Sequence, residues 1–114
     1  MSVTAQGSGT QTATISTEHT LLDVAVAGVY SLHVDKNAMA SGDTLELRVY
    51  QMVLTGGTRR PAYKVVFTGA QDADDLIAVS VPIANELTDS GSLRFTLKQT
   101  AGAGRAFPWK VLKY

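Results

Sequence analysis

The chain has 114 residues, 45% of them hydrophobic, and its ten basic and ten acidic residues cancel. This length suits one domain with a single hydrophobic core, and the balanced charge disfavours a general nucleic-acid-binding protein, which would carry an excess of basic residues. The chain has no cysteine, which excludes disulfides, thiolate metal sites and a cysteine nucleophile.

The N-terminal segment is small and polar. Residues 1–10 contain two glycines and almost no apolar side chain, a composition that predicts a flexible arm. The segment has neither the basic start nor the apolar stretch of a signal peptide, and no part of the chain reaches the ~20 apolar residues of a membrane span. We therefore expect a protein that has no membrane partner and is retained in a cytoplasm.

The rest of the chain alternates between apolar and polar side chains, which is the period of a β-strand. The alternation is clearest in residues 44–50 (TLELRVY) and 92–98 (SLRFTLK). Strands are expected over residues 11–17, 20–26, 29–34, 44–55, 59–68, 76–83, 92–100 and 105–112. No helix longer than a turn or two is expected, so the fold class is all-β.

The connections between these strands carry further predictions. Gly56 and Gly57 indicate a hairpin turn, and residues 101–104 suggest a second hairpin that joins the last two strands. Pro61 suits a sheet edge or a bulge, and Pro108 a sheet edge, because proline lacks the N–H that a sheet needs. In the connection over residues 35–42, Met39 is expected to reach into the core.

About eight strands separated by turn signals predict a single antiparallel β-sandwich over residues 11–114. A jelly-roll-like arrangement is the first expectation, and an immunoglobulin-like sandwich is the alternative.

The sequence contains no clear catalytic or metal-binding motif. His19 and His33 lack the spacing of a metal-binding pair. Asp72, Asp74 and Asp75 form an acidic loop without the glycine and glutamate of a calcium-binding EF-hand, which leaves open whether the loop binds a cation. We expect no enzymatic activity, no metal and no cofactor.

The glycine-rich residues 102–105 resemble a phosphate-binding loop only superficially. They lack the lysine and the following helix of such a loop, and they lie between two predicted strands.

Four residues are candidates for a partner interface. Arg59 and Arg60 follow the predicted hairpin turn, where they either bind carboxylates of a neighbouring subunit or form a solvated sheet edge. Trp109 and Tyr114, near the C-terminus, either complete the core or anchor an interface. Strand alternation places Trp109 on the face of Phe107 and Val111, so it is expected at the rim of the core and partly buried.

Residues 17–24 (TEHTLLDV), 27–30 (AGVY), 41–50 (SGDTLELRVY) and 88–97 (TDSGSLRFTL) resemble small structural proteins of tailed-bacteriophage virions. The resemblance covers most of residues 15–114. Among such virion proteins, the sequence is similar to the jelly-roll cement or decoration proteins of capsids.

This resemblance implies a non-enzymatic virion protein, synthesised in a bacterial cytoplasm, that stabilises contacts between capsid subunits. It also implies a homotrimer whose N-terminal arm lies along its neighbours. Two alternatives from other classes are a receptor- or glycan-binding domain of a tail fibre or spike, and a hydrolase or lyase such as a cupin. The missing His-x-His pair disfavours the cupin.

Overall fold

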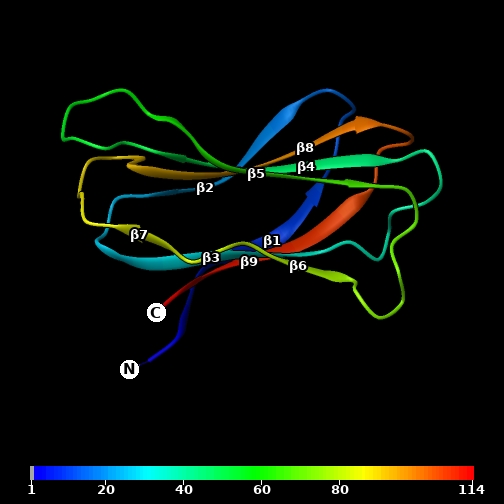
Figure 1. Cartoon of the computed structure of the whole chain (residues 1–114), viewed down its shortest axis with the longest axis horizontal. Helices are drawn as coiled ribbons and strands as arrows, with labels where there is room; N and C mark the ends of the chain where they lie inside the picture. Colours follow the sequence, from blue (N-terminus) through cyan, green and yellow to red (C-terminus); the bar gives the residue numbers. More distant parts are fainter. Residues whose placement is uncertain (1) are drawn as a thin grey trace.

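The computed structural model describes residues 2–114, which form two layered β-sheets and no helix (Figure 1). The strands are β1 (Thr4–Thr12), β2 (Glu18–Val24), β3 (Gly28–Asp35), β4 (Thr44–Gln51), β5 (Arg60–Thr68), β6 (Ile77–Val79), β7 (Ile83–Asn85), β8 (Leu93–Ala101) and β9 (Ala106–Lys113). All pairings between them are antiparallel. The prediction of an all-β antiparallel sandwich is confirmed.

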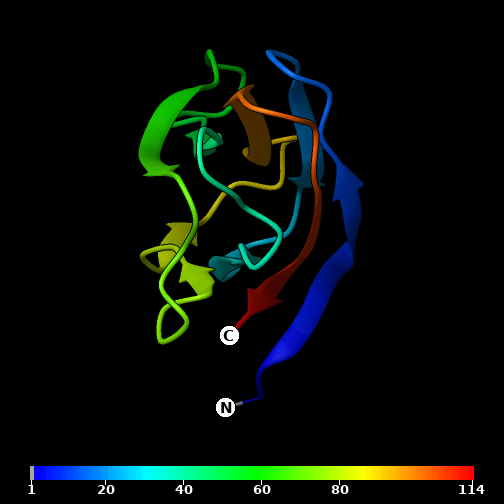
Figure 2. The same cartoon turned by 90° about the vertical axis from the view of Figure 1, so that its right-hand side faces the viewer.

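The chain passes back and forth between the two sheets. One sheet has the order β1-β9-β3-β6, with β7 also beside β3, and the other has the order β2-β8-β4-β5. The predicted hairpin between β4 and β5 is present, and most other connections cross from one layer to the other (Figures 1 and 2). This order is compatible with a jelly roll, in which two interlocked Greek keys form two facing sheets.

The structure has nine strands where about eight were expected, because the segment predicted as one strand over residues 76–83 is divided. Pro82 cannot donate a hydrogen bond to a sheet, and β6 ends before it. Ser80 bridges the interruption: its N–H donates to the carbonyl of Leu32 at 2.8 Å, and its Oγ accepts from the N–H of Leu32 at 2.9 Å. The neighbouring strand β3 therefore keeps its backbone hydrogen bonds.

The core lies between the sheets and is built by the alternation read from the sequence. The inward side chains are buried, and the fully enclosed ones include Tyr30, Leu32, Val34, Leu45, Val49, Leu93, Phe95, Leu97, Phe107 and Val111. Met39 reaches this core from its connection, as predicted. Pro61 lies on β5, at the edge of its sheet and beside a bulge, also as predicted.

The prediction of a flexible arm over residues 1–10 is wrong for residues 4–10, and Met1 lies outside the described residues. These residues form most of β1, which pairs with β9 along its whole length. The two glycines that suggested flexibility face the sandwich interior. A Cβ atom on Gly7 would lie 3.1 Å from Leu22 of the opposite sheet, and one on Gly9 would lie 3.5 Å from the indole nitrogen of Trp109. The small residues give larger neighbours room to pack on the backbone.

Two predictions for the C-terminal strands are also wrong. β8 and β9 do not pair as a hairpin, since they lie in opposite sheets. Pro108 is not on an edge strand, because β9 lies between β1 and β3. Proline is tolerated there because the pairing of β9 with β3 covers residues 109–113 only, so Pro108 has no partner on β3.

Candidate functional site

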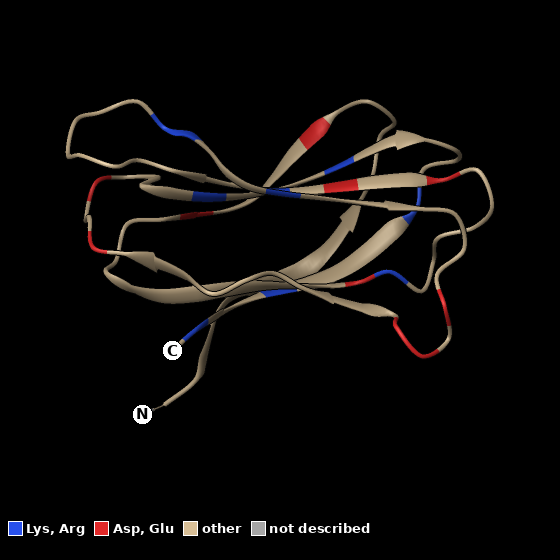
Figure 3. Ribbon diagram, in the orientation of Figure 1, with Lys and Arg blue, Asp and Glu red and all other residues tan. Residues whose placement is uncertain are grey.

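The outer faces of the two sheets differ in chemistry. Figure 3 shows most of the strand-borne charges on the layer formed by β2, β8, β4 and β5. The charged side chains that this layer directs outward are Glu18, Asp23, Glu46, Arg48, Lys64, Arg94 and Lys98. The layer of β1, β9, β3 and β6 carries mainly small, polar or apolar side chains on its outer face. Among them, Ile77 and Val79 on β6 are more than half exposed.

The four sheet edges also differ. An exposed edge strand invites pairing with another chain, and proteins normally block such edges with charges, proline, bulges or very short strands. β5 carries Arg60, Pro61 and Lys64, and β2 carries two carboxylates and a bulge. β6 and β7 have three residues each.

The remaining edge strand, β1, has nine residues and no charge or proline. Its one bulge lies at its start, between Ala5 and Gly7. The stretch from Gly7 to Thr12 is therefore the one long, regular and unprotected edge among residues 2–114, and we call it the β1 edge. Figure 2 shows β1 along one side of the molecule.

A polar pocket with a volume of about 320 Å³ opens on the outer face of the sheet formed by β2, β8, β4 and β5. It is lined by Glu18, Thr20, Tyr50, Arg59, Arg94 and Thr96, which come from β2, β4, β8 and the segment before β5. Strand alternation directs these side chains away from the core, and the pairing of β8 with both β2 and β4 brings them together.

Hydrogen bonds fix the groups of this pocket in place. Glu18 Oε2 accepts from the hydroxyls of Tyr50 at 2.6 Å and Thr96 at 2.7 Å. Burial acts to raise the pKa of Glu18, but these two hydrogen bonds and the nearby Arg48 outweigh it, and the pKa is lowered. Arg94 donates from Nε and Nη2 to the two carboxylate oxygens of Asp23, at 2.7 and 3.0 Å. The hydrogen bonds from Arg94 lower the pKa of Asp23, so the carboxylate stays ionised.

The two candidate arginines have different surroundings. Arg59 is partly buried, lines the polar pocket and donates from Nη1 to the carbonyl of Gly91 at 3.1 Å. Arg60 is exposed and lies outside this pocket, at the first residue of β5. Neither lies in the turn of the connection, which is closed by the hydrogen bond from the N–H of Gly57 to the carbonyl of Leu54 at 2.9 Å. The expected contact of these arginines with a neighbouring subunit stays a prediction.

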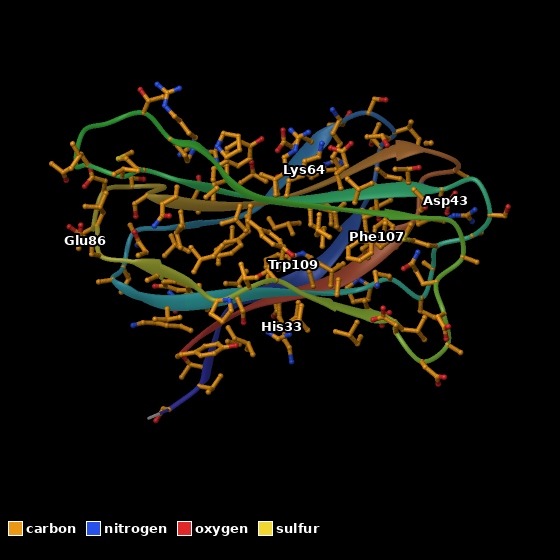
Figure 4. The ribbon with its side chains drawn as sticks, viewed as in Figure 1. His33, Asp43, Lys64, Glu86, Phe107 and Trp109 are labelled. Atoms are coloured by element: carbon orange, nitrogen blue, oxygen red, sulfur yellow. The ribbon has the colours of Figure 1, made fainter. Side chains whose placement is uncertain are left out.

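Trp109 and Tyr114 lie on opposite faces of their sheet. Trp109 is partly buried and packs against the core, as predicted, and it points between the sheets together with Phe107 (Figure 4). Tyr114 is 39% exposed, and its hydroxyl lies 2.8 Å from Ser31 Oγ. An interface role for these residues stays a prediction.

Ser31 Oγ also lies 2.8 Å from His33 Nε2, and no motif of the sequence predicts this contact. Burial, followed by the charge of Lys110, lowers the pKa of His33 and favours its neutral form. Such a pair is the minimum of a serine nucleophile with its base. Ser31 has no exposed surface, however, so its hydroxyl serves the packing of His33 and Tyr114 on the sheet.

The acidic loop has a structural explanation within the chain. The side chain of Asp72 accepts from the N–H of Asp74 at 2.9 Å, and Asp75 lies 3.8 Å from the ammonium group of the buried Lys36. No group of three or more metal-ligating side chains occurs within residues 2–114.

The glycine-rich residues 102–105 connect β8 to β9 and are held by neighbouring side chains. The amide of Gln99 donates to the carbonyls of Ala101 at 3.0 Å and Ala103 at 2.7 Å. Arg105 Nε donates to the buried Asp43 at 2.8 Å. The segment therefore closes one end of the sandwich.

Comparison of the chain with protein-family models, curated proteins and solved structures finds no match. The part of the chain that the structure describes contains no helix that is long and apolar enough to cross a membrane.

Proposed function

We propose that the protein is a non-enzymatic structural component of a bacteriophage virion, a capsid cement or decoration protein that stabilises contacts between capsid subunits. The observation that carries this proposal is the β1 edge. A strand of a neighbouring subunit would pair along it and continue the sheet, a mode of recognition in which backbone hydrogen bonds supply the affinity.

The chemistry of β1 fits this role. In an antiparallel sheet, about half of the residues of an edge strand direct their N–H and C=O groups away from the strand already paired with them. The side chains of Ser8, Thr10 and Thr12 are small and exposed, so they leave room for an incoming strand. Each backbone hydrogen bond contributes about 0.5–1.5 kcal/mol net, which makes the edge a substantial source of binding energy.

The way in which β1 is held in the fold also supports a role as a docking edge. The strand is held against β9 by its backbone pairing and by the neighbours that pack on Gly7 and Gly9. A partner strand would thus meet a rigid template rather than an arm that must first become ordered, and it would avoid that entropy cost. We further propose that the protein acts as a homotrimer in the virion.

Charged substitutions on the edge test the proposal. Thr10→Lys and Thr12→Lys together place two charges on the β1 edge, opposite the uncharged Pro108 and Ala106 of β9. We expect the melting temperature to change little and binding to capsids that lack the protein to fall at least about tenfold, which is about 1.4 kcal/mol. The matched control is Ala62→Lys with Thr68→Lys on β5, an edge that already carries charge, and it should bind normally.

Cosedimentation with the capsids measures this binding, and light scattering measures the oligomer. Unchanged capsid binding by the β1 variant, with the fold intact, would contradict the proposal that β1 is the docking edge. Absence of binding by the unmodified protein would contradict the cement function itself.

A further inference from the structure

The polar pocket holds several hydrogen-bonding groups that no residue among 2–114 uses. Arg94 binds Asp23 through Nε and Nη2, which leaves Nη1 without a partner. Glu18 Oε2 accepts two hydrogen bonds, whereas Oε1 accepts none from residues 2–114, and Arg48 Nη1 lies 3.8 Å from it, beyond hydrogen-bond reach. Thr20 also lines the pocket, and its hydroxyl makes no hydrogen bond within the described residues.

Arg59 is the unbalanced charge of the pocket. It uses Nη1 to hold the carbonyl of Gly91, and it forms no ion pair within residues 2–114. The nearby Asp23 is already engaged by both nitrogens of Arg94. Arg94 is thus paired with Asp23, which leaves Arg59 as the cation of the lining without an ion pair among residues 2–114. The open edge of its guanidinium group suits a planar anion such as a carboxylate.

These groups are held in place before any ligand arrives. Tyr50 and Thr96 fix Glu18, Asp23 fixes Arg94, and a backbone carbonyl fixes Arg59. Preorganised groups lose little conformational entropy on binding, which is a property of binding sites rather than of solvated surface. The volume of about 320 Å³ lies at the small end of the range for small-molecule sites and fits one ring rather than a long ligand.

We infer that this pocket binds a carboxylated sugar, a hexuronic acid unit of a polysaccharide. The carboxylate would accept hydrogen bonds from Nη1 of Arg94 and from the nitrogens of Arg59 that do not hold Gly91. The hydroxyls of the sugar ring would donate to Glu18 Oε1 and exchange hydrogen bonds with Thr20. The inference goes beyond the proposed function and does not depend on it.

The mixture of groups favours a sugar acid over a protein carboxylate. An aspartate or glutamate of a neighbouring subunit would find Arg59 but would also face the carboxylate of Glu18, with no hydroxyl to donate to it. Like charges at short range disfavour binding, whereas a hydroxyl donor beside the anion satisfies both halves of the pocket.

The test is a titration of the full-length, isotope-labelled protein followed by NMR, with glucuronate, glucose, acetate and phosphate as separate ligands. We expect glucuronate to bind with a Kd near about 1 mM and to shift the amides around Thr20, Arg59 and Arg94. Glucose and acetate, which each offer half of the recognition, should bind at least tenfold more weakly, and so should phosphate.

Two variants in the pocket and one control outside it localise the site. Arg59→Gln should weaken glucuronate binding at least tenfold, whereas the neighbouring Arg60→Gln, outside the pocket, should bind as the unmodified protein does. Thr20→Val should weaken binding of glucuronate several-fold and leave binding of acetate unchanged. Equal binding of glucuronate, acetate and phosphate would overturn the inference in favour of a general anion site, and no binding of glucuronate at tens of millimolar would overturn it outright.

Discussion

Removing the carboxylate of Asp43 should destabilise the protein strongly, because this group ties together one end of the sandwich (Figure 4). Asp43 is 1% exposed, and its Oδ2 accepts from Arg105 Nε at 2.8 Å and from the N–H of Ala40 at 2.9 Å. Its backbone carbonyl accepts from the N–H of Gly69 at 2.8 Å. The residue thus connects three loops that are distant in the sequence.

The size of the effect follows from the burial of the two partners. Breaking a fully buried ion pair costs about 3–5 kcal/mol. The side chain of Arg105 is 33% exposed, so water compensates part of the loss, and we expect Asp43→Ala to lower the free energy of unfolding by about 2–4 kcal/mol. For a domain of this size, that corresponds to a fall in melting temperature of about 8–16 °C.

Acid should remove this difference. The hydrogen bonds from Arg105 and then Ala40 lower the pKa of Asp43 in the folded protein. Its stabilisation is therefore complete above the unfolded-state value near 3.9 and is lost as the pH falls through the lower folded-state value.

Urea unfolding at pH 7 and at successively lower pH measures the gap between the two proteins. Asp74→Ala, in the exposed acidic loop, is the control and should cost no more than about 0.5 kcal/mol. A gap below about 1 kcal/mol at pH 7, or a gap that widens in acid, would show that the Asp43 carboxylate does not stabilise the fold through Arg105 and Ala40.

Three further substitutions test the packing by urea unfolding. Trp109→Ala should lower the free energy of unfolding by about 2–4 kcal/mol, less than the 3–5 kcal/mol of a fully buried aromatic side chain. The fluorescence of Trp109 in the folded protein should be blue-shifted relative to the unfolded chain. A loss below about 1 kcal/mol would contradict the contact of Trp109 with the core. Gly7→Val should cost about 1–3 kcal/mol, since even a Cβ atom would lie 3.1 Å from Leu22, and a neutral outcome would show that β1 is not seated there. Ser80→Ala should lower the free energy of unfolding by about 1–3 kcal/mol because the N–H of Leu32 loses its acceptor. An unchanged stability would mean that the fold tolerates the break between β6 and β7 without the Ser80 hydroxyl.

Alternation along the chain predicted most of the fold. Leu45, Leu47 and Val49 are buried and their neighbours Glu46 and Arg48 face outward, as the period of two requires. This pattern is local, and it is written in each strand by the contrast between apolar and polar side chains.

The first strand was predicted over residues 11–17 and lies at Thr4–Thr12 instead, because β1 has no such contrast. Its inward positions include Gly7 and Gly9, and the apolar groups that fill the space above these glycines, Leu22 and Trp109, come from elsewhere in the sequence. The crossover from β8 to β9 was missed for a related reason: a glycine-rich connection suits a hairpin equally well, and only the pairing with β1 and β3 decides where β9 lies.

The polar pocket was predicted only in part. Arg59 was a candidate residue, but its neighbours Glu18, Tyr50 and Arg94 come from three strands that meet through their register. Each of them is an outward polar residue of an alternating strand, and nothing in the local sequence distinguishes it from solvated surface. Their convergence is a property of strand order, which the pattern of a single strand does not contain.

Cryo-EM of phage particles purified from cells that express this protein tests whether β1 docks on a capsid subunit. If the proposed cement function holds, a strand of a neighbouring subunit is paired with the free edge of β1 along Gly7 to Thr12. A reconstruction in which that edge faces solvent, while the protein contacts the particle elsewhere, would contradict it.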